Sequence, residues 1–172
     1  MNVNYKNRKY TVVPYDPKWR DDFIKEAGTL KSIFGKKALS IEHVGSTAIP
    51  ELAGKPTIDI LILVDDVSIA SVLNQKMEEA GYKYLGEYVT KGVVLFIREE
   101  DNTRLVNVHI FQEDDPKVKE MLDLKNYILI HPEVAKKYSQ LKLDLFGKYP
   151  DDYGSYRKYK DEWMEKLKEK IV

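Results

Sequence analysis

The chain has 172 residues, which is enough for one domain with a hydrophobic core but too few for two comfortable ones. Its 28 Lys and Arg residues balance its 28 Asp and Glu residues, so the charge gives no signal for nucleic acid or an anionic membrane as a partner. The absence of cysteine excludes disulfides and thiol chemistry. The sequence shows neither an apolar leader nor an apolar run of membrane length, and we therefore expect a cytoplasmic protein.

The first part of the chain mixes helix and strand patterns. Asp16 and Pro17 indicate the start of a helix whose apolar residues recur at helical spacing as far as Gly35. A second amphipathic helix is expected to begin at Asp65 or Asp66 and to end before Gly81. Alternating or continuous apolar runs predict strands over residues 39–44, 57–64, 82–89, 93–98 and 104–111.

After Glu113 the patterns indicate helices only. Their predicted starts are Asp115–Pro116, Pro132, and Asp151 or Asp152. Strands followed by helices are typical of an α+β fold. We therefore predict a single domain over residues 1–172, with a strand-rich core over 12–113 and C-terminal helices over 114–172. One mixed sheet should be backed by the two early helices, and the C-terminal helices should close one side.

The segment with the clearest functional signal runs from Glu42 to Leu63. Gly45 and Ser46 form a turn after the first strand, and small residues before a short helix suit the binding of an anion. Asp59 lies within the apolar run IDILILV, where a carboxylate is costly to bury without a partner. This pattern indicates a metal, a charged partner or a hydrogen-bonded turn at Asp59.

Four segments of the sequence resemble the GrpB family. They are HVGSTAIPELAGKPTIDILI at 43–62, VVPYDPKW at 12–19, VHIF at 108–111 and YRKYKDEW at 156–163. That family is similar to the nucleotidyltransferase superfamily. The resemblance implies a nucleotidyltransferase-like fold, in which the Gly-Ser turn holds nucleotide phosphates and Asp-hydrophobic-Asp binds divalent metal. It thereby assigns the catalytic carboxylate to Asp59. The second carboxylate of that motif is replaced here by Leu61.

Strand alternation extends the candidate metal site. Asp59 should share a face of the sheet with Asn107 and His109 of a later strand. Asp59 and His109, with His43 as a third ligand, could bind a borderline divalent metal. Both histidines could equally be structural, hydrogen-bonding within their strands. Because Leu61 supplies no carboxylate, we expect at most one weakly bound Mg²⁺ or Mn²⁺.

Several basic residues are candidates for phosphate binding besides Gly45 and Ser46. Lys55 precedes the second strand and could contact a phosphate. Arg98 and Arg104 flank a charged turn, where they could clamp an anion or pair with neighbouring acidic residues. Lys160 lies in YRKYKDEW, and the family resemblance places it near the site. The many tyrosines of the last helices could stack on a base, although packing between helices is the alternative.

Two functional classes stay open. The first is a metal-dependent nucleotidyltransferase-like enzyme, in which an acceptor hydroxyl attacks the α-phosphorus of a nucleotide. The second is a non-catalytic module that binds a phosphorylated small molecule or a partner protein in the same pocket. Family members fused to a dephospho-coenzyme A kinase imply a nucleotide or a coenzyme A derivative as the ligand. The sequence does not determine the substrate or the oligomeric state.

Overall fold

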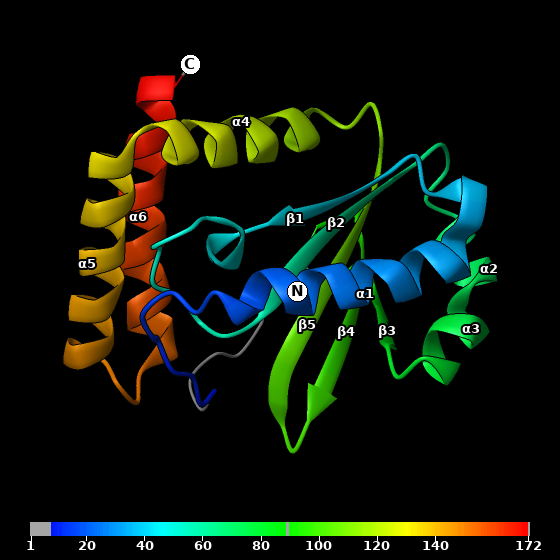
Figure 1. The fold of residues 1–172 in the computed structure, drawn as a ribbon, viewed down its shortest axis with the longest axis horizontal. Coiled ribbons are helices and arrows are strands. Elements are labelled where there is room, and N and C mark those ends of the chain that lie inside the picture. Colours follow the sequence, from blue (N-terminus) through cyan, green and yellow to red (C-terminus); the bar gives the residue numbers. More distant parts are fainter. Residues whose placement is uncertain (1–7, 89, 172) are drawn as a thin grey trace.

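The computed structural model describes residues 8–88 and 90–171. Within them, five strands form one mixed sheet in the order β1-β2-β5-β4-β3 (Figure 1). The central strands β2 and β5 are parallel, and the other neighbouring strands are antiparallel. The strands are β1 (Ser40–Val44), β2 (Ile58–Val64), β3 (Lys83–Gly86), β4 (Val94–Glu100) and β5 (Thr103–Gln112). The predicted α+β fold, with its strands in one sheet, is thereby confirmed.

Helix α1 (Lys18–Phe34) covers one face of this sheet (Figure 1). Its start follows the predicted signal, because the Asp16 carboxylate accepts a hydrogen bond of 2.9 Å from the Lys18 amide. Three residues of this helix, Trp19, Leu30 and Phe34, are buried against the apolar residues of β2, β4 and β5. This is the largest hydrophobic core of the described residues, and it fixes which face of each strand remains for a site.

The predicted continuous helix from Asp65 or Asp66 to Gly81 is wrong. Two short helices, α2 (Ile69–Val72) and α3 (Asn74–Glu79), meet at Leu73 instead. The Ser71 hydroxyl donates to the Ser68 carbonyl, a local bond that competes with regular helical bonding. The predicted strand over 82–89 is also shorter, since β3 ends at Gly86 and Val89 lies outside the described residues.

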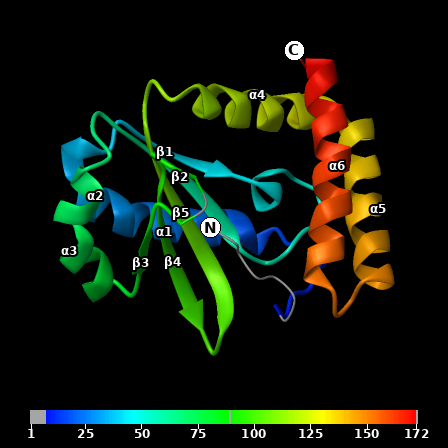
Figure 2. The same cartoon turned by 180° about the vertical axis from the view of Figure 1, so that it is seen from behind.

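The C-terminal helices lie beyond β1 and along one side of the sheet. They are α4 (Pro116–Ile130), α5 (Pro132–Lys148) and α6 (Tyr153–Ile171). Figure 2 shows α5 and α6 side by side next to the loop that follows β1, with α4 crossing above the strands. The sheet face opposite α1 is the face turned toward the viewer in this figure. No helix within residues 8–88 and 90–171 combines the length and apolar character needed to cross a membrane.

The loop between β1 and β2 joins the sheet to these helices. It begins with the short 3-10 helix η2 (Ser46–Ala48), which matches the η1 turn (Gly35–Lys37) in length. Ile49 and Leu52 of the loop are buried against α4, α5 and α6. The Ser139 hydroxyl of α5 accepts a 2.7 Å hydrogen bond from the Ala53 amide. The helices thereby fix the backbone of the loop that carries the Gly-Ser turn.

Candidate functional site

Asp59 lies on the sheet face opposite α1, next to polar residues of β5. Its Oδ1 accepts a 2.9 Å hydrogen bond from the Asn107 amide, and the same oxygen lies 3.5 Å from His109 Nε2. Arg104 in turn donates a 2.9 Å hydrogen bond to Asn107 Oδ1. The predicted placement of Asp59, Asn107 and His109 on one face is confirmed. The four side chains form a polar row across the two parallel strands.

This row keeps the Asp59 carboxylate ionised. Burial alone would raise the pKa of Asp59, but hydrogen bonds from His109 and Asn107 and the charge of Lys55 outweigh it. The pKa of Asp59 is therefore below its ordinary value. Its side chain is 30% exposed, so this anion is accessible from solvent. It can attract a cation or a hydrogen-bond donor of a ligand.

Gly45 brings the Gly-Ser turn against this carboxylate. A Cβ at position 45 would lie 2.7 Å from Asp59 Oδ2, and the backbone has φ 74° and ψ −172°. Residues with a Cβ atom rarely adopt this backbone conformation, and the close approach of the Asp59 carboxylate leaves no room for a methyl group at position 45. Glycine is thus needed at position 45 for two independent reasons. The turn and Asp59 form one site although 13 positions separate Gly45 from Asp59 within the sequence.

The side chain of Lys142 also reaches this turn. The sequence did not single out Lys142 as part of the site. Lys142 of α5 is 1% exposed, and its Nζ donates a 2.7 Å hydrogen bond to Ser46 Oγ. The Tyr138 hydroxyl is also hydrogen-bonded to Ser46, and the Tyr138 ring lies 4.3 Å from Lys142 Nζ. Tyr138 and Lys142 are one helical turn apart, so α5 directs both side chains at the same hydroxyl.

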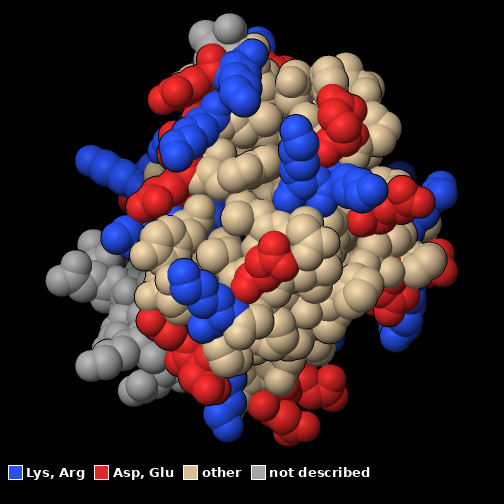
Figure 3. All heavy atoms as spheres, turned by 90° about the vertical axis from the view of Figure 1, so that its left-hand side faces the viewer, with Lys and Arg blue, Asp and Glu red and all other residues tan. Residues whose placement is uncertain are grey.

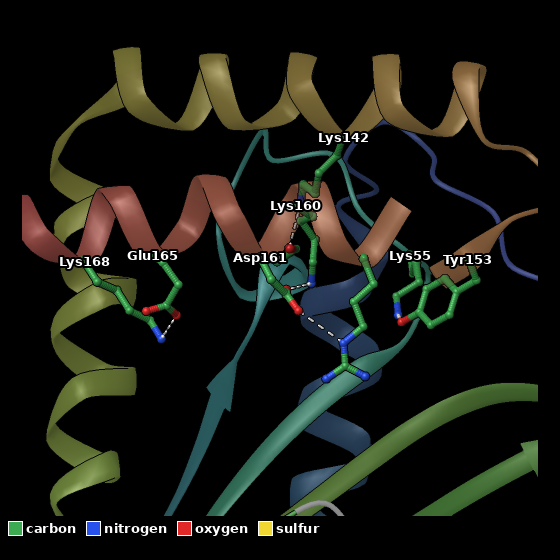
Figure 4. Close-up of polar contacts among 9 residues, drawn as sticks. Lys55, Lys142, Tyr153, Lys160, Asp161, Glu165 and Lys168 are labelled. Carbon is green, nitrogen blue, oxygen red and sulfur yellow. Dashed lines mark hydrogen bonds and ion pairs between the residues drawn. The ribbon is translucent and has the colours of Figure 1, made fainter. Parts of the chain in front are cut away.

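Two more lysines gather around this loop. Figure 4 shows Lys142 from α5 and Lys160 from α6 directed into the space beside the loop, with Lys55 nearby. Lys160 is paired with Asp161 at 3.2 Å, and Lys55 donates a 2.5 Å hydrogen bond to the Tyr153 hydroxyl. Among the described residues, no carboxylate forms an ion pair with Lys142. Lys142 is therefore a buried basic side chain without an acidic partner among the described residues.

Burial and this crowding of charge weaken the basicity of the lysines. Burial is the main cause that lowers the pKa of Lys142 well below its ordinary value, and the charges of Lys160 and Lys55 add to it. Burial likewise lowers the pKa of Lys55 to about 8, with a further contribution from Arg8. Both ammonium groups would become more stable beside a bound anion.

The outer face of α5 and α6 differs from this interior cluster. Figure 3, which views the molecule from the α5 side, shows basic and acidic side chains interspersed around uncharged surface. The buried lysine without an acidic partner thus lies beside the Ser46 loop and not on this outer face. A small cavity of about 90 Å³ opens at Gly45 and Ser46, with mainly apolar walls that include Ile49, Met121 and Tyr138.

Two predicted residues lie away from the site. His43 stacks on Phe23 of α1, with ring centroids 4.6 Å apart, and its Nε2 lies 2.8 Å from Thr47 Oγ1. Burial is the main cause that lowers the pKa of His43 to about 4, so this ring is neutral at pH 7. Arg98 forms an ion pair with Glu26 of α1. Both side chains belong to the α1 side of the sheet, and the structure does not bring them together with Asp59.

The remaining arginine of the predicted clamp is close to the site but already partnered. Arg104 pairs with Glu99 at 3.1 Å, which is the alternative that the sequence left open, and it also reaches Asn107. As to metal binding, Asp59 and His109 supply one carboxylate and one imidazole. The described residues contain no group of three or more His, Cys, Asp or Glu side chains suited to a metal ion. Oxygen atoms of a ligand would have to complete the shell of a Mg²⁺ ion at Asp59.

Comparison with known proteins identifies the family. The family described as GrpB protein matches residues 9–170. This chain belongs to the GrpB family. It is 31% identical to the glutamate-rich protein GrpB of Alkalihalophilus pseudofirmus over 160 residues, which cover 91% of this chain and 92% of that protein. It is 35% identical to the UPF0157 protein YqkA of Bacillus subtilis, where the match covers 96% of this chain but 48% of YqkA, so the chain spans about half of that relative.

Solved structures confirm the fold of this GrpB chain. The crystal structure of GrpB from Enterococcus faecalis superposes with a TM-score of 0.88 at 33% identity, over 94% of this chain and 96% of that one. The Cid1 poly(U) polymerase bound to MgATP gives a TM-score of 0.53 at 12% identity, covering 78% of this chain and 44% of that one. The similarity to Cid1 shows a nucleotidyltransferase-like fold and nothing further. A dephospho-CoA kinase of Mycobacterium tuberculosis is 26% identical over 89% of this chain and 44% of that protein.

Proposed function

We propose that this GrpB chain binds a phosphorylated small molecule, a nucleotide or a coenzyme A derivative, at the Gly45–Ser46 turn. The observation that carries this proposal is the buried Lys142, which reaches Ser46 and has no carboxylate partner among the described residues. A lysine buried without an anion is costly to protonate, and a bound phosphate would reduce that cost. Lys160, 25% exposed, would contact the phosphate directly, while Lys142 would act through Ser46.

Asp59 gives the proposed ligand a second point of attachment. Its carboxylate lies against Gly45 and is ionised, so a Mg²⁺ or Mn²⁺ ion could bridge it to the ligand phosphates. When bound, such an ion would offset the negative charge on the phosphates. Lys55 and His109 flank the same carboxylate. The proposal therefore predicts that divalent metal strengthens ligand binding although the protein alone holds metal weakly.

The bound ligand could be a substrate for nucleotidyl transfer or could be held without any reaction. The second candidate function is this non-catalytic binding, and Leu61 favours it. This side chain is fully buried in an apolar cluster with Val44, Phe111 and Val118, where the superfamily resemblance places a second metal carboxylate. Two-metal transfer needs bridging carboxylates that hold the ions about 3.5–4 Å apart. Transfer of a nucleotidyl group to an acceptor hydroxyl would thus have to proceed at Asp59 with a single ion.

A thermal-shift screen of nucleotides and coenzyme A derivatives, each with and without Mg²⁺ or Mn²⁺, tests the proposal. A ligand at about 100 times its Kd stabilises the folded state by about 2.7 kcal/mol, which for a chain of this size corresponds to roughly 5–10 °C. We expect such a shift with at least one ligand class and a smaller shift for the Ser46→Ala variant. If no phosphorylated compound changes the melting temperature, the proposal fails.

A further inference from the structure

The contact between Ser46 and Lys142 combines a hydroxyl with an amine suited to accept its proton. Nζ and Oγ are 2.7 Å apart, within the range in which a base removes a proton from a nucleophile. A protonated lysine could only donate to the hydroxyl, whereas a neutral amine can accept the proton. Lys142 is 1% exposed and no carboxylate pairs with it in the described parts of the chain. Burial and the charges of Lys160 and Lys55 lower the pKa of Lys142 well below its ordinary value, which favours the neutral amine.

The positive charges around Lys142 favour this state, whereas the Tyr138 ring, whose centroid lies 4.3 Å from Nζ, attracts a cation. Lys160 of α6 and Lys55 of the β1–β2 loop contribute positive charge. Tyr138 of α5 presents its ring and a hydroxyl whose pKa burial raises, so it stays neutral. Asp161 of α6 is already paired with Lys160 and Arg157. None of these groups stabilises an ammonium ion at Lys142 in the way that a paired carboxylate would.

The backbone holds the two residues in this geometry. Gly54 lies directly beside them, since a Cβ at position 54 would be 2.9 Å from Ser46 Cβ and 3.5 Å from Lys142 Nζ. Gly54 is itself fixed by two 3.0 Å hydrogen bonds with the backbone of Val13. Ser46 is half-buried and lines the small cavity, whereas Lys142 lies behind it. The hydroxyl can therefore face a ligand while its proton faces the amine.

We propose that Ser46 is a nucleophile activated by Lys142, and that it accepts a phosphoryl or nucleotidyl group from a bound phosphoanhydride. This step deepens the proposed function and rests on it. Ser46 Oγ forms a bond to phosphorus, and the bond from phosphorus to the bridging oxygen of the leaving phosphate breaks. The hydroxyl proton passes to the neutral Lys142 Nζ, which becomes an ammonium ion. The leaving phosphate departs as an anion beside Lys160. This route uses no second metal carboxylate, the group that Leu61 replaces.

The first experiment measures the nucleophilicity of Ser46 without any phosphate ligand. The protein is treated with diisopropyl fluorophosphate, which labels activated serine hydroxyls, and the adduct is located by peptide mass spectrometry. We expect labelling of Ser46 in the wild type at pH 8, and at least a tenfold slower rate in Lys142→Met and Lys142→Arg. An arginine at this position stays protonated and therefore cannot accept the proton. Melting curves identify any variant that does not fold, and Lys137→Met, which removes an exposed lysine of the same helix, should still be labelled.

The second experiment supplies ATP and Mg²⁺ to the same proteins. An adduct on Ser46, or release of phosphate or pyrophosphate that disappears in Ser46→Ala and Lys142→Arg, supports the inference. The mass of the adduct distinguishes a phosphoryl from an adenylyl group.

Each contrary result has a defined meaning. Failure of the fluorophosphate to label Ser46 at any pH up to 9 overturns the inference, while calorimetric binding of tripolyphosphate by the same sample would leave the proposed function standing. Labelling without any adduct or product from ATP overturns the transfer step. Absence of tripolyphosphate binding rejects the proposed function, and with it the transfer step.

Discussion

The replacement of Gly45 by alanine tests the contact that joins the Gly-Ser turn to Asp59. Two costs add up in this variant. The backbone at φ 74° and ψ −172° lies in a region adopted essentially by glycine alone, which costs an alanine about 1–3 kcal/mol. The new methyl group would also lie 2.7 Å from Asp59 Oδ2, so the carboxylate must move away from its Asn107 donor. Weakening that partly exposed hydrogen bond adds about 1 kcal/mol.

The expected loss in the free energy of unfolding is therefore about 2–4 kcal/mol, which for a chain of this length lowers Tm by roughly 5–15 °C. Urea denaturation and calorimetric melting measure both quantities. Gly28→Ala is the matched control, since a Cβ at position 28 of α1 meets nothing within 4 Å. That variant should gain about 0.5–1 kcal/mol from helix propensity. If Gly45→Ala is as stable as Gly28→Ala, the geometry inferred for the turn is refuted.

Three further predictions concern the charged groups of the site. Asp59→Asn should reduce the strengthening of ligand binding by Mg²⁺ at least tenfold in calorimetric titrations, and an unchanged Mg²⁺ dependence would contradict a metal role for Asp59. Leu61→Asp should raise Mg²⁺ affinity but lower the free energy of unfolding by about 3 kcal/mol or more, because it places a charge in an apolar cluster; urea unfolding with and without Mg²⁺ measures both. The low pKa of Lys55, about 8, means that the unfolded state binds more protons between pH 8 and pH 10, so stability rises with pH there. Relative to Lys55→Met, the wild type should gain about 2 kcal/mol between pH 7 and pH 9.5 in urea unfolding, and no relative gain would show that Lys55 titrates normally.

The sequence predicted the parts of the site that follow from local rules. Alternation along β2 and β5 correctly placed Asp59, Asn107 and His109 on one face, because the side-chain period of a strand is fixed. Gly45 and Ser46 were recognisable from their position after a strand. These residues need only the strand register to come together.

The parts that the sequence missed depend on helices distant in the chain. Lys142 is 96 positions from Ser46, and only the packing of α5 on the β1–β2 loop brings them into contact. A lysine one turn after Tyr138 on an otherwise apolar helix stripe was the available signal. The sequence grouped His43 and Arg98 with the site because it did not determine which side of the sheet α1 covers. In the structure their partners, Phe23 and Glu26, both lie on α1.

Calorimetric titration of inorganic tripolyphosphate tests the central claim, that phosphate binds beside the Gly45–Ser46 turn, without assuming the organic part of the ligand. The comparison is between the wild type, Lys160→Met and Lys158→Met, which remove the same charge from the same helix. Lys160 faces the site, whereas Lys158 is exposed on α6. Loss of a hydrogen bond to a charged group, about 1.5–3 kcal/mol, predicts a roughly 10-fold to 150-fold weaker Kd for Lys160→Met and little change for Lys158→Met. Equal affinities for all three proteins, or no binding by the wild type, would contradict the account.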